Sequence, residues 1–221
     1  FIDTYDEEDQ RLDIWIRGPQ FASNGDPIYN QFDPELSDVQ LNYTNHLGSV
    51  DDTKEYEGYR VGKFEIEKGV NGTAISNDVP FFRYADALMI KAECLLRNGN
   101  PDDAALIVSQ VRERAFPDNP EKAQVTGTEL MEGSIYNYGV YKDGEVVSAE
   151  GGDDIEYGRF LDELGYEFAA EFHRRQDLIR FGVYTSKSWL SHVPNGSHRS
   201  IFPIPQSALD ANPNLQQNTG Y

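Results

Sequence analysis

The sequence predicts a mainly α-helical protein, built on tetratricopeptide-like helical hairpins that are joined by long irregular loops and short β-hairpins. Two stretches, residues 83–116 and 157–182, carry apolar residues at helical spacing. The stretches 1–79 and 117–158 are rich in turn-forming residues and hold only short alternating runs. The chain has 221 residues, which is enough for one large domain or two small ones with a buried core.

Residues 1–79 predict loops and short strands. Pro27 and Pro34 interrupt regular structure in the turn-rich stretch "GDPIYNQFDPELSD". Trp15 stands in the alternating segment "LDIWIRG", so we expect it in the core. The stretch "GYRVGKFEIEKG", residues 58–69, predicts a strand with one slip in register.

Residues 83–116 predict two amphipathic helices joined by a tight turn. Two apolar stripes at helical spacing are formed by Ala85, Leu88, Met89, Ala92 and Leu96, then by Ala104, Ile107, Val108, Val111 and Ala115. Between them, Gly99 suits the left-handed residue that closes a helix, and Asn100 and Pro101 suit the start of the next. The hairpin is close to the tetratricopeptide period of roughly 34 residues. One hairpin cannot bury its own apolar face, so other helices must cover it.

Residues 117–158 predict a loop and hairpin insert. Asp143-Gly144 is a two-residue turn signal between alternating apolar positions of "YNYGVYKDGEVV". The tyrosines of this stretch, Tyr136, Tyr138 and Tyr141, are expected on an exposed ribbon.

A second helical segment, residues 157–182, follows the insert. We expect side-chain pairs four residues apart, from Glu171 to Arg175 and from His173 to Asp177. Arg174, Arg175 and Arg180 fall late in this segment, where cations favour the helix dipole. A structural role for these arginines is therefore favoured over a phosphate site.

The C-terminal residues predict an extended chain with one short helix. Pro203 and Pro205 favour extended backbone, and residues 207–210 predict a helical turn. The polar tail that follows is expected to be loose unless it docks.

Composition limits the partners. The formal net charge is −19, which excludes nucleic acid because phosphate binding needs clustered cations. The same charge opposes docking on anionic lipid. Cys94, the single cysteine, is predicted to be an inert buried thiol on an apolar helical face. No run of 18 apolar residues predicts a membrane span, and the absence of a starting Met suggests a fragment or a processed product.

Sequence signatures of enzymes are missing. The chain has no G-x-S-x-G, H-E-x-x-H, G-x-x-x-x-G-K-[ST] or C-x-x-C motif, and its four histidines are scattered. Its 38 acidic residues offer too many carboxylate pairs for the sequence alone to exclude glycoside hydrolysis. We expect no catalytic residue, no cofactor and no metal site. Asn24, Asp26 and Asp33 leave calcium open as an alternative, although their spacing matches no known loop.

Three blocks of the chain resemble one family, the SusD/RagB proteins. The blocks are "PFFRYADALMIKAECLLRNG", "FLDELGYEFAAEFHRRQDLIRFG" and "FPIPQSALDANPNLQQNTGY", in this order. The chain departs from the family pattern at Leu164-Gly165, where the family often has an arginine, and at Phe172, where it often has a glycine. The resemblance covers roughly residues 80–116 and 157–221.

The resemblance implies a SusD-like α-α superhelix and a non-catalytic role in glycan capture. It implies that residues 1–221 are a C-terminal SusD/RagB-like domain, with 117–158 as an insert and the N-terminal part of the family architecture absent. Proteins of this family are outer-membrane lipoproteins that capture oligo- or polysaccharide for a SusC-like TonB-dependent transporter. The resemblance therefore implies the cell surface as location, with membrane association only through a lipid anchor outside this chain.

Sugar binding calls for aromatic faces that stack on sugars, together with hydrogen-bond donors and acceptors for hydroxyls. The loop aromatics offered for this role are Tyr136, Tyr138, Tyr141, Tyr29, Tyr43 and Trp189, with Phe32 and Tyr56 as further members. The alternative reading of the chain is a tetratricopeptide-like protein–protein interaction module without sugar binding. One clear hairpin and long aromatic-rich loops favour the glycan reading.

Overall fold

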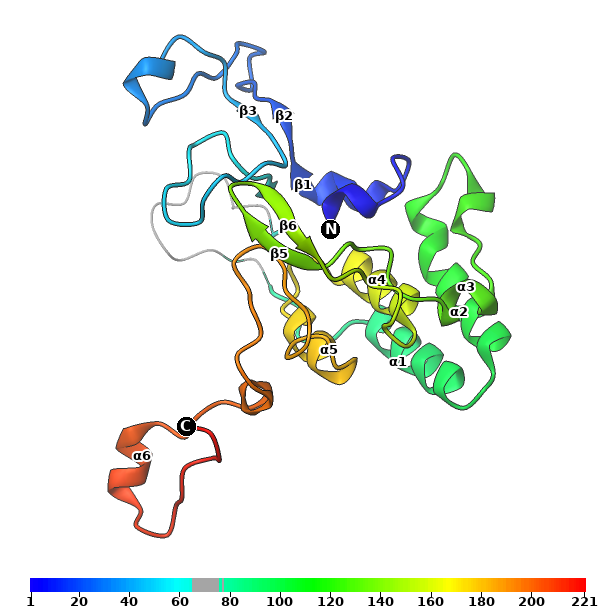
Figure 1. The fold of residues 1–221 in the computed structure, drawn as a ribbon. Coiled ribbons are helices and arrows are strands. Elements are labelled where there is room, and N and C mark those ends of the chain that lie inside the picture. The colour runs from blue at the N-terminus through cyan, green and yellow to red at the C-terminus, as the bar shows by residue number, and fades with distance from the viewer. Residues whose placement is uncertain (65–75, 77) are drawn as a thin grey trace.

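The computed structural model describes residues 1–64, 76 and 78–221. A body of packed helices carries two projecting segments, one at each end of the chain (Figure 1). The helices of the described part are α1 Tyr84–Arg97, α2 Pro101–Arg112, α3 Gly127–Met131, α4 Gly158–Glu167, α5 Arg174–Arg180 and α6 Gln206–Ala211. Its strands are β1 Trp15–Ile16, β2 Gly18–Pro19, β3 Asn42–Tyr43, β4 Arg60–Val61, β5 Gly139–Lys142 and β6 Glu145–Ala149. Helices dominate the body, so the predicted fold class is confirmed.

The hairpin of α1 and α2 forms as the sequence predicts. Gly99 adopts φ +78°, and the N–H of Asn100 donates to the carbonyl of Leu95, which closes α1. Pro101 then opens α2. The facing stripes meet through Ala92 and Ala104, both fully buried, because small side chains let the helices approach closely.

The main core lies where α1 and α2 pack against α3 and α4. Phe160, Leu164 and Phe168 supply the large side chains from α4 and the residue that follows it. Leu130 closes the core from α3. The helices thus bury the apolar face that a single hairpin would leave exposed.

The second helical segment is not continuous. α4 ends at Glu167, α5 begins at Arg174, and Ala170 and Phe172 adopt positive φ values of 62° and 67° between them. This backbone turns the chain sharply, so Arg174 and Arg175 stand in the first turn of α5. The prediction that they fall late in a helix is wrong, and a favourable helix dipole does not account for them.

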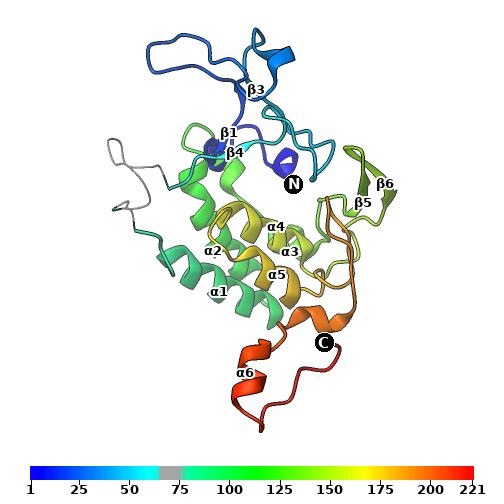
Figure 2. The ribbon, with the colours of Figure 1, turned by 90° about the vertical axis from the view of Figure 1, so that its left-hand side faces the viewer.

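Residues 1–64 form short strand pairs and loops. β1 pairs with β4 and β2 with β3, both antiparallel, and the β2–β3 region projects from the body (Figures 1 and 2). Only Arg60–Val61 of the predicted strand 58–69 is a strand, and residues 65–69 lie outside the described residues. Trp15 is partly buried and packs on a small core of Tyr5, Leu12 and Tyr166.

The insert 117–158 contains the predicted hairpin. β5 and β6 are antiparallel, and Asp143 (φ 51°) and Gly144 (φ 83°) form the two-residue turn between them. Upstream, the insert also contains the short helix α3, which starts with a capping box of Thr126 and Glu129. This box was missed by the sequence reading, which treated the stretch as loop.

The C-terminal segment, drawn in orange to red, runs away from the helical body, and the chain ends beside the 3-10 helix Ser197–Ser200 (Figure 2). The tail docks on the extended proline segment, since the side chain of Gln217 bonds both the N–H and the carbonyl of Ile204. The hydroxyl of Tyr221 donates to the carbonyl of Ile201 at 2.6 Å. We name residues 190–221 the C-terminal arm.

Cys94 is exposed, so the prediction of a buried thiol is wrong. It follows Ala92 by two residues, which on a helix turns it to the opposite side from the buried stripe. No helix in the described part of the chain is long and apolar enough to cross a bilayer.

Candidate functional site

Three of the six proposed sugar-binding aromatics come together beside β5. The rings of Tyr136 and Tyr138 meet edge-on with centroids 4.7 Å apart, and Tyr138 meets Trp189 at 6.1 Å. Phe1 extends the row on the other side, 5.9 Å from Tyr136. We name these four residues the aromatic row.

Tyr138 is the buried member of the aromatic row. It is 2% exposed and packs with Leu161 and Leu178, so the prediction that it lies on an exposed ribbon is wrong. The reason is its position just before β5, where the chain faces α4 rather than solvent. Burial raises the pKa of the Tyr138 phenol to about 12. Tyr136 and Trp189 are half-buried.

The other three candidates lie on separate elements. Tyr29 is 45% exposed and forms an isolated bridge with Gln40. Tyr43 belongs to β3, where the guanidinium of Arg60 covers its ring at 4.7 Å. Tyr141 is a half-buried residue of β5. The structure therefore keeps Tyr29 and Tyr43 apart from the aromatic row, whereas Tyr141 lies within electrostatic range of Tyr136.

A cleft of about 500 Å³ opens next to Phe1, at the end of the aromatic row. We name it the aromatic cleft; its main lining residues are Phe1, Trp15, Phe168, Phe172, Arg174 and Arg175. The turn between α4 and α5 shapes it and leaves Phe172 86% exposed. A Cβ at Gly165 would lie 2.5 Å from the Phe1 ring and 2.8 Å from Nη1 of Arg174, so a larger residue there would push these two side chains aside.

Aromatic contacts hold the two arginines of the aromatic cleft. The guanidinium of Arg174 lies 4.7 Å from the Phe1 ring centroid, and its Nη1 donates to the carbonyl of Leu161 at 2.8 Å. Arg175 lies over Tyr184 at 4.9 Å and over Phe202 at 4.2 Å. Stacking fixes these cations in place while most of their N–H groups remain available.

A smaller pocket of about 280 Å³ lies where the C-terminal arm meets α5. We name it the arm pocket; its aromatic and cationic lining consists of Arg175, Tyr184, His192, Arg199, Phe202 and Tyr221. Its base is rigid, because the His192 ring stacks on Trp189 at 3.8 Å. Arg175 lines both the arm pocket and the aromatic cleft, so the two hollows share this residue.

These hollows have the chemistry that saccharides need. Sugars present apolar faces that stack on aromatic rings, and hydroxyls that exchange hydrogen bonds with polar side chains. Phe172 offers an exposed ring, while Arg174 and Arg175 offer positioned donors. Sequence reasoning missed the aromatic cleft because Phe1, Trp15 and Phe172 meet only through the fold.

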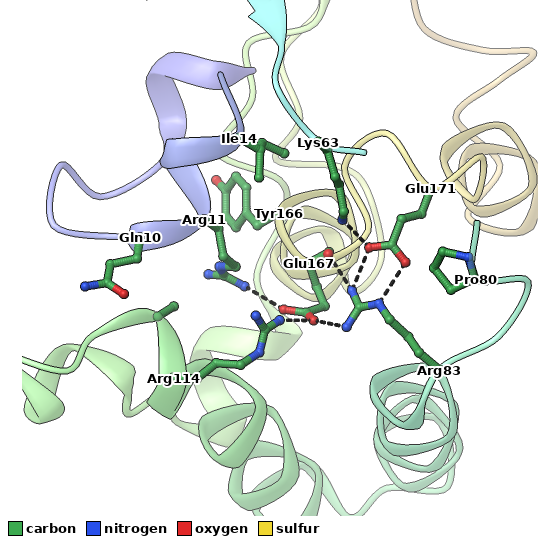
Figure 3. Close-up of a pocket in the computed structure, with 11 residues that line it drawn as sticks. Gln10, Arg11, Ile14, Lys63, Pro80, Arg83, Arg114, Tyr166, Glu167 and Glu171 are labelled. Atoms are coloured by element: carbon green, nitrogen blue, oxygen red, sulfur yellow. Dashed lines mark hydrogen bonds and ion pairs between the residues drawn. The ribbon is translucent and has the colours of Figure 1, made fainter. Parts of the chain in front are cut away.

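A third pocket, of about 370 Å³, lies over a network of ion pairs (Figure 3). We name this network the charged cluster; it consists of five cations and four carboxylates, namely Arg11, Lys63, Arg83, Arg112, Arg114, Asp9, Glu163, Glu167 and Glu171. Its centre is buried, since the side chain of Glu167 is 0% exposed and that of Arg11 is 6% exposed.

The charged cluster joins distant segments of the chain. Arg83, just before α1, bonds Glu167 at the end of α4 at 2.6 Å and Glu171 at 2.7 Å. Arg11, from the 3-10 helix Gln10–Ile14, pairs with Glu163 of α4 at 3.3 Å. The four carboxylates of the charged cluster neutralise nearly all of the positive charge of its five cations. The role of the cluster in holding the fold together therefore explains it without a ligand.

The predicted pairs around Glu171 are wrong. Glu171 bonds Arg83 and Lys63 rather than Arg175, and His173 lies 3.4 Å from Asp86 rather than pairing with Asp177. The first error follows from the break between α4 and α5, because helical spacing does not hold between Glu171 and Arg175 across it. His173 and Asp177 do keep helical spacing in α5, and the His173 ring is turned to Asp86 instead.

Acid is expected to weaken the charged cluster through Glu171. Burial opposes ionisation of this carboxyl, yet hydrogen bonds from Arg83 and Lys63 outweigh it and hold its pKa below the ordinary value. Because the pKa of Glu171 is lower in the folded state than in the unfolded state, ionised Glu171 stabilises the fold. This stabilisation is fully present above the unfolded-state pKa of about 4.3, and it is lost as the pH falls through the folded-state pKa. Glu171→Gln should therefore lower stability at pH 7 and flatten its loss below about pH 4.3, as measured by urea unfolding across pH. An unchanged pH profile would contradict this.

The described residues contain no group of three or more His, Cys, Asp or Glu side chains placed to hold a metal ion. At the calcium alternative, the amide of Asn24 donates to the carboxylate of Asp26 at 2.7 Å. Asp33 accepts from the N–H of Glu35 as a helix cap. These are local turn contacts, and they offer no converging set of oxygens.

The sequence model of the SusD family matches residues 1–221. Starch-binding protein SusD of Bacteroides thetaiotaomicron is 31% identical over 160 residues, which is 68% of this chain and 23% of that protein. SusD-like protein P38 of Formosa agariphila is 31% identical over 169 residues, which is 75% of this chain and 29% of that protein. The chain thus spans about a quarter of the length of the curated relatives it matches.

Solved structures share the fold. A SusD homolog from Bacteroides thetaiotaomicron has a TM-score of 0.56 and 23% identity, over 97% of this chain and 41% of that one. Surface glycan-binding protein A of the same organism has a TM-score of 0.51 and 21% identity, over 99% of this chain and 40% of that one. Because the family's sequence model spans every residue and the fold agrees, the chain belongs to the SusD family.

Proposed function

We propose that this chain is part of a non-catalytic, cell-surface protein that binds oligo- or polysaccharide and delivers it to a SusC-like TonB-dependent transporter. The full-length protein would sit at the outer membrane through a lipid anchor outside this chain. Membership of the SusD family supports the proposal, and so does similarity to a starch-binding and a surface glycan-binding protein.

The observation that supports sugar binding most directly is the aromatic cleft. It combines an exposed Phe172 ring with the donors of Arg174 and Arg175, in a hollow large enough for sugar rings. Of the aromatics offered by the sequence, Tyr136 and Trp189 belong to the row that adjoins it. Tyr29 and Tyr43 would contact a long polymer away from the aromatic cleft, and Tyr141 would contact it beside Tyr136. Tyr138 would support its neighbours from within.

One observation favours the alternative of a protein-binding module. Phe81, Phe82 and Tyr84, at the start of α1, are 85%, 68% and 73% exposed. Contiguous exposed aromatics mark protein contacts as readily as sugar contacts. A partner protein on this face and a glycan in the aromatic cleft would be compatible.

A matched pair of phenylalanines tests the proposed site. Phe172→Ala in the full-length mature protein should weaken binding of its glycan about tenfold, because a stacked aromatic contributes about 1–1.5 kcal/mol. Phe21→Ala, at an exposed phenylalanine outside the cleft, should leave binding unchanged. Native affinity electrophoresis against plant, microbial and host polysaccharides finds the ligand, and calorimetry measures both variants. Equal affinities would move the site elsewhere, and no retardation by any glycan would favour the protein-binding module.

A further inference from the structure

We infer that the glycan is anionic, and that its acidic group is bound by Arg175 together with Arg174 and Arg199, where the aromatic cleft meets the arm pocket. The inference rests on the proposed function and deepens it, because it names the class of sugar. It also runs against the overall charge of −19, so it needs support from local structure.

These three arginines differ from the other arginines around α4 and α5. Arg180, on the same helix as Arg175, pairs with Asp177 at 2.8 Å and also contacts Glu93. Among residues 1–64, 76 and 78–221, no carboxylate lies within 4.0 Å of the guanidinium of Arg174, Arg175 or Arg199. Arg174 lies within electrostatic range of the buried carboxylates of Asp162 and Asp177. Arg175 and Arg199 are therefore the two arginines that need an explanation in a chain of 38 acidic and 19 basic residues.

Helix stability does not supply that explanation. Arg174 and Arg175 stand in the first turn of α5, where the positive end of the helix dipole disfavours cations. Their alkyl stems could pack equally well if each were paired with an acidic side chain. An anionic ligand would supply the missing negative charge.

Many of the guanidinium donors of these arginines have no hydrogen-bond partner among the residues that the structure describes. A guanidinium has five N–H groups in a planar fork that matches a carboxylate. The hydrogen bonds of the described residues occupy Nη1 of Arg174, through Leu161, and Nη2 of Arg175, through the carbonyl of Arg199. Arg199 itself is held over the Tyr221 ring at 5.0 Å. Stacking therefore orients these forks before any ligand arrives, which reduces the entropy lost on binding.

The positions of the two hollows determine where the acidic sugar unit would bind. Arg175 lines both the aromatic cleft of about 500 Å³ and the arm pocket of about 280 Å³. A glycan that extends from one hollow into the other would run alongside Arg175. Aromatic rings stand on both sides, Phe172 in the cleft and Phe202 in the pocket, where they can stack on neighbouring sugar units.

The negative charge of the whole chain does not prevent this contact. Interactions between exposed charges are screened beyond about 10 Å at 0.1 M salt, whereas a carboxylate bonded to arginine lies at about 2.8 Å. Repulsion would slow the approach of an acidic glycan, and the arginines would retain it once bound.

The test uses the full-length mature protein and pairs of glycans that differ only in charge. Oligogalacturonide is compared with its methyl ester, sialyllactose with lactose, and a sulfated oligosaccharide with its desulfated form. We expect the acidic member of at least one pair to bind at least tenfold tighter, and Arg175→Gln to reduce that preference to about twofold or less. Arg17→Gln, an equal charge change at an exposed arginine outside both hollows, should leave the preference intact.

Each outcome decides between the two proposals. Binding of neutral glycans without any acidic preference would overturn the inference and leave the proposed function standing. An acidic preference that survives both Arg175→Gln and Arg199→Gln would overturn the assignment to this junction, and Arg199→Gln serves if Arg175→Gln fails to fold. No binding to any glycan would overturn the proposed function itself.

Discussion

Replacing Glu167 with alanine is expected to lower the free energy of unfolding by about 3–5 kcal/mol. The carboxylate of Glu167 is 0% exposed and accepts hydrogen bonds from Arg83 and Arg114, with Arg11 at 3.7 Å. Removal of this carboxylate takes away negative charge that balances the neighbouring arginines. The free-energy cost of burying those cations remains, so the folded state becomes less stable. Urea unfolding of the full-length protein measures the change.

An exposed ion pair provides the control for Glu167. Lys54 and Asp52 pair at 3.2 Å, with side chains 44% and 80% exposed, so Asp52→Ala should change stability by less than about 1 kcal/mol. Glu167→Gln keeps the volume and removes only the charge. A loss as small as that of Asp52→Ala would show that the charged cluster does not stabilise the fold.

Phe160→Ala is expected to have a similar effect, about 3–5 kcal/mol, for a different reason. Phe160 is 0% exposed and lies in the main core between the α1–α2 hairpin and α4, with its ring stacked 6.5 Å from that of Phe181. Truncation removes buried apolar surface and leaves a cavity that the surrounding helices cannot fully close.

The same substitution at an exposed phenylalanine separates the effect of burial from the effect of changing phenylalanine to alanine. Phe32 is 84% exposed on the N-terminal loops, so Phe32→Ala should change stability by less than about 0.5 kcal/mol. Thermal and urea unfolding of both variants test the difference. Equal losses would mean that the core is not where the structure places it.

Local signals made part of the fold predictable. The α1–α2 hairpin could be read from residues 83–116 because Gly99, Asn100 and Pro101 each specify one backbone state in sequence order. The β5–β6 hairpin could be read from Asp143-Gly144 in the same way. In both cases, residues adjacent in the chain determine the geometry.

Other features had no local signal. The break between α4 and α5 occurs at Ala170 and Phe172, which take positive φ without a glycine or proline to mark the place. The charged cluster joins Arg11 to Glu163, which are 152 residues apart, and no spacing rule covers such a pair. Tertiary packing overrides helical periodicity here.

The position of the candidate site could not be predicted from the sequence. Of the loop aromatics that the sequence offered, Tyr136 and Trp189 belong to one aromatic row, and their binding of sugar stays a prediction. Phe172 and Arg175 were assigned to a continuous helix, and that assignment concealed the aromatic cleft. Aromatic stacking between distant segments can be seen only after the chain has folded.

The charged cluster also affects the order in which the chain folds. The α1–α2 hairpin consists of contacts between near neighbours and can form early, whereas the ion pair between Arg11 and Glu163 closes most of the chain into one loop. Closing such a loop costs entropy that only the assembled core can repay, so the charged cluster forms late. Interactions absent from the transition state slow unfolding without speeding folding. The buried carboxylates of α4 therefore affect the unfolding rate of the chain more than its folding rate, so they determine the lifetime of the folded state.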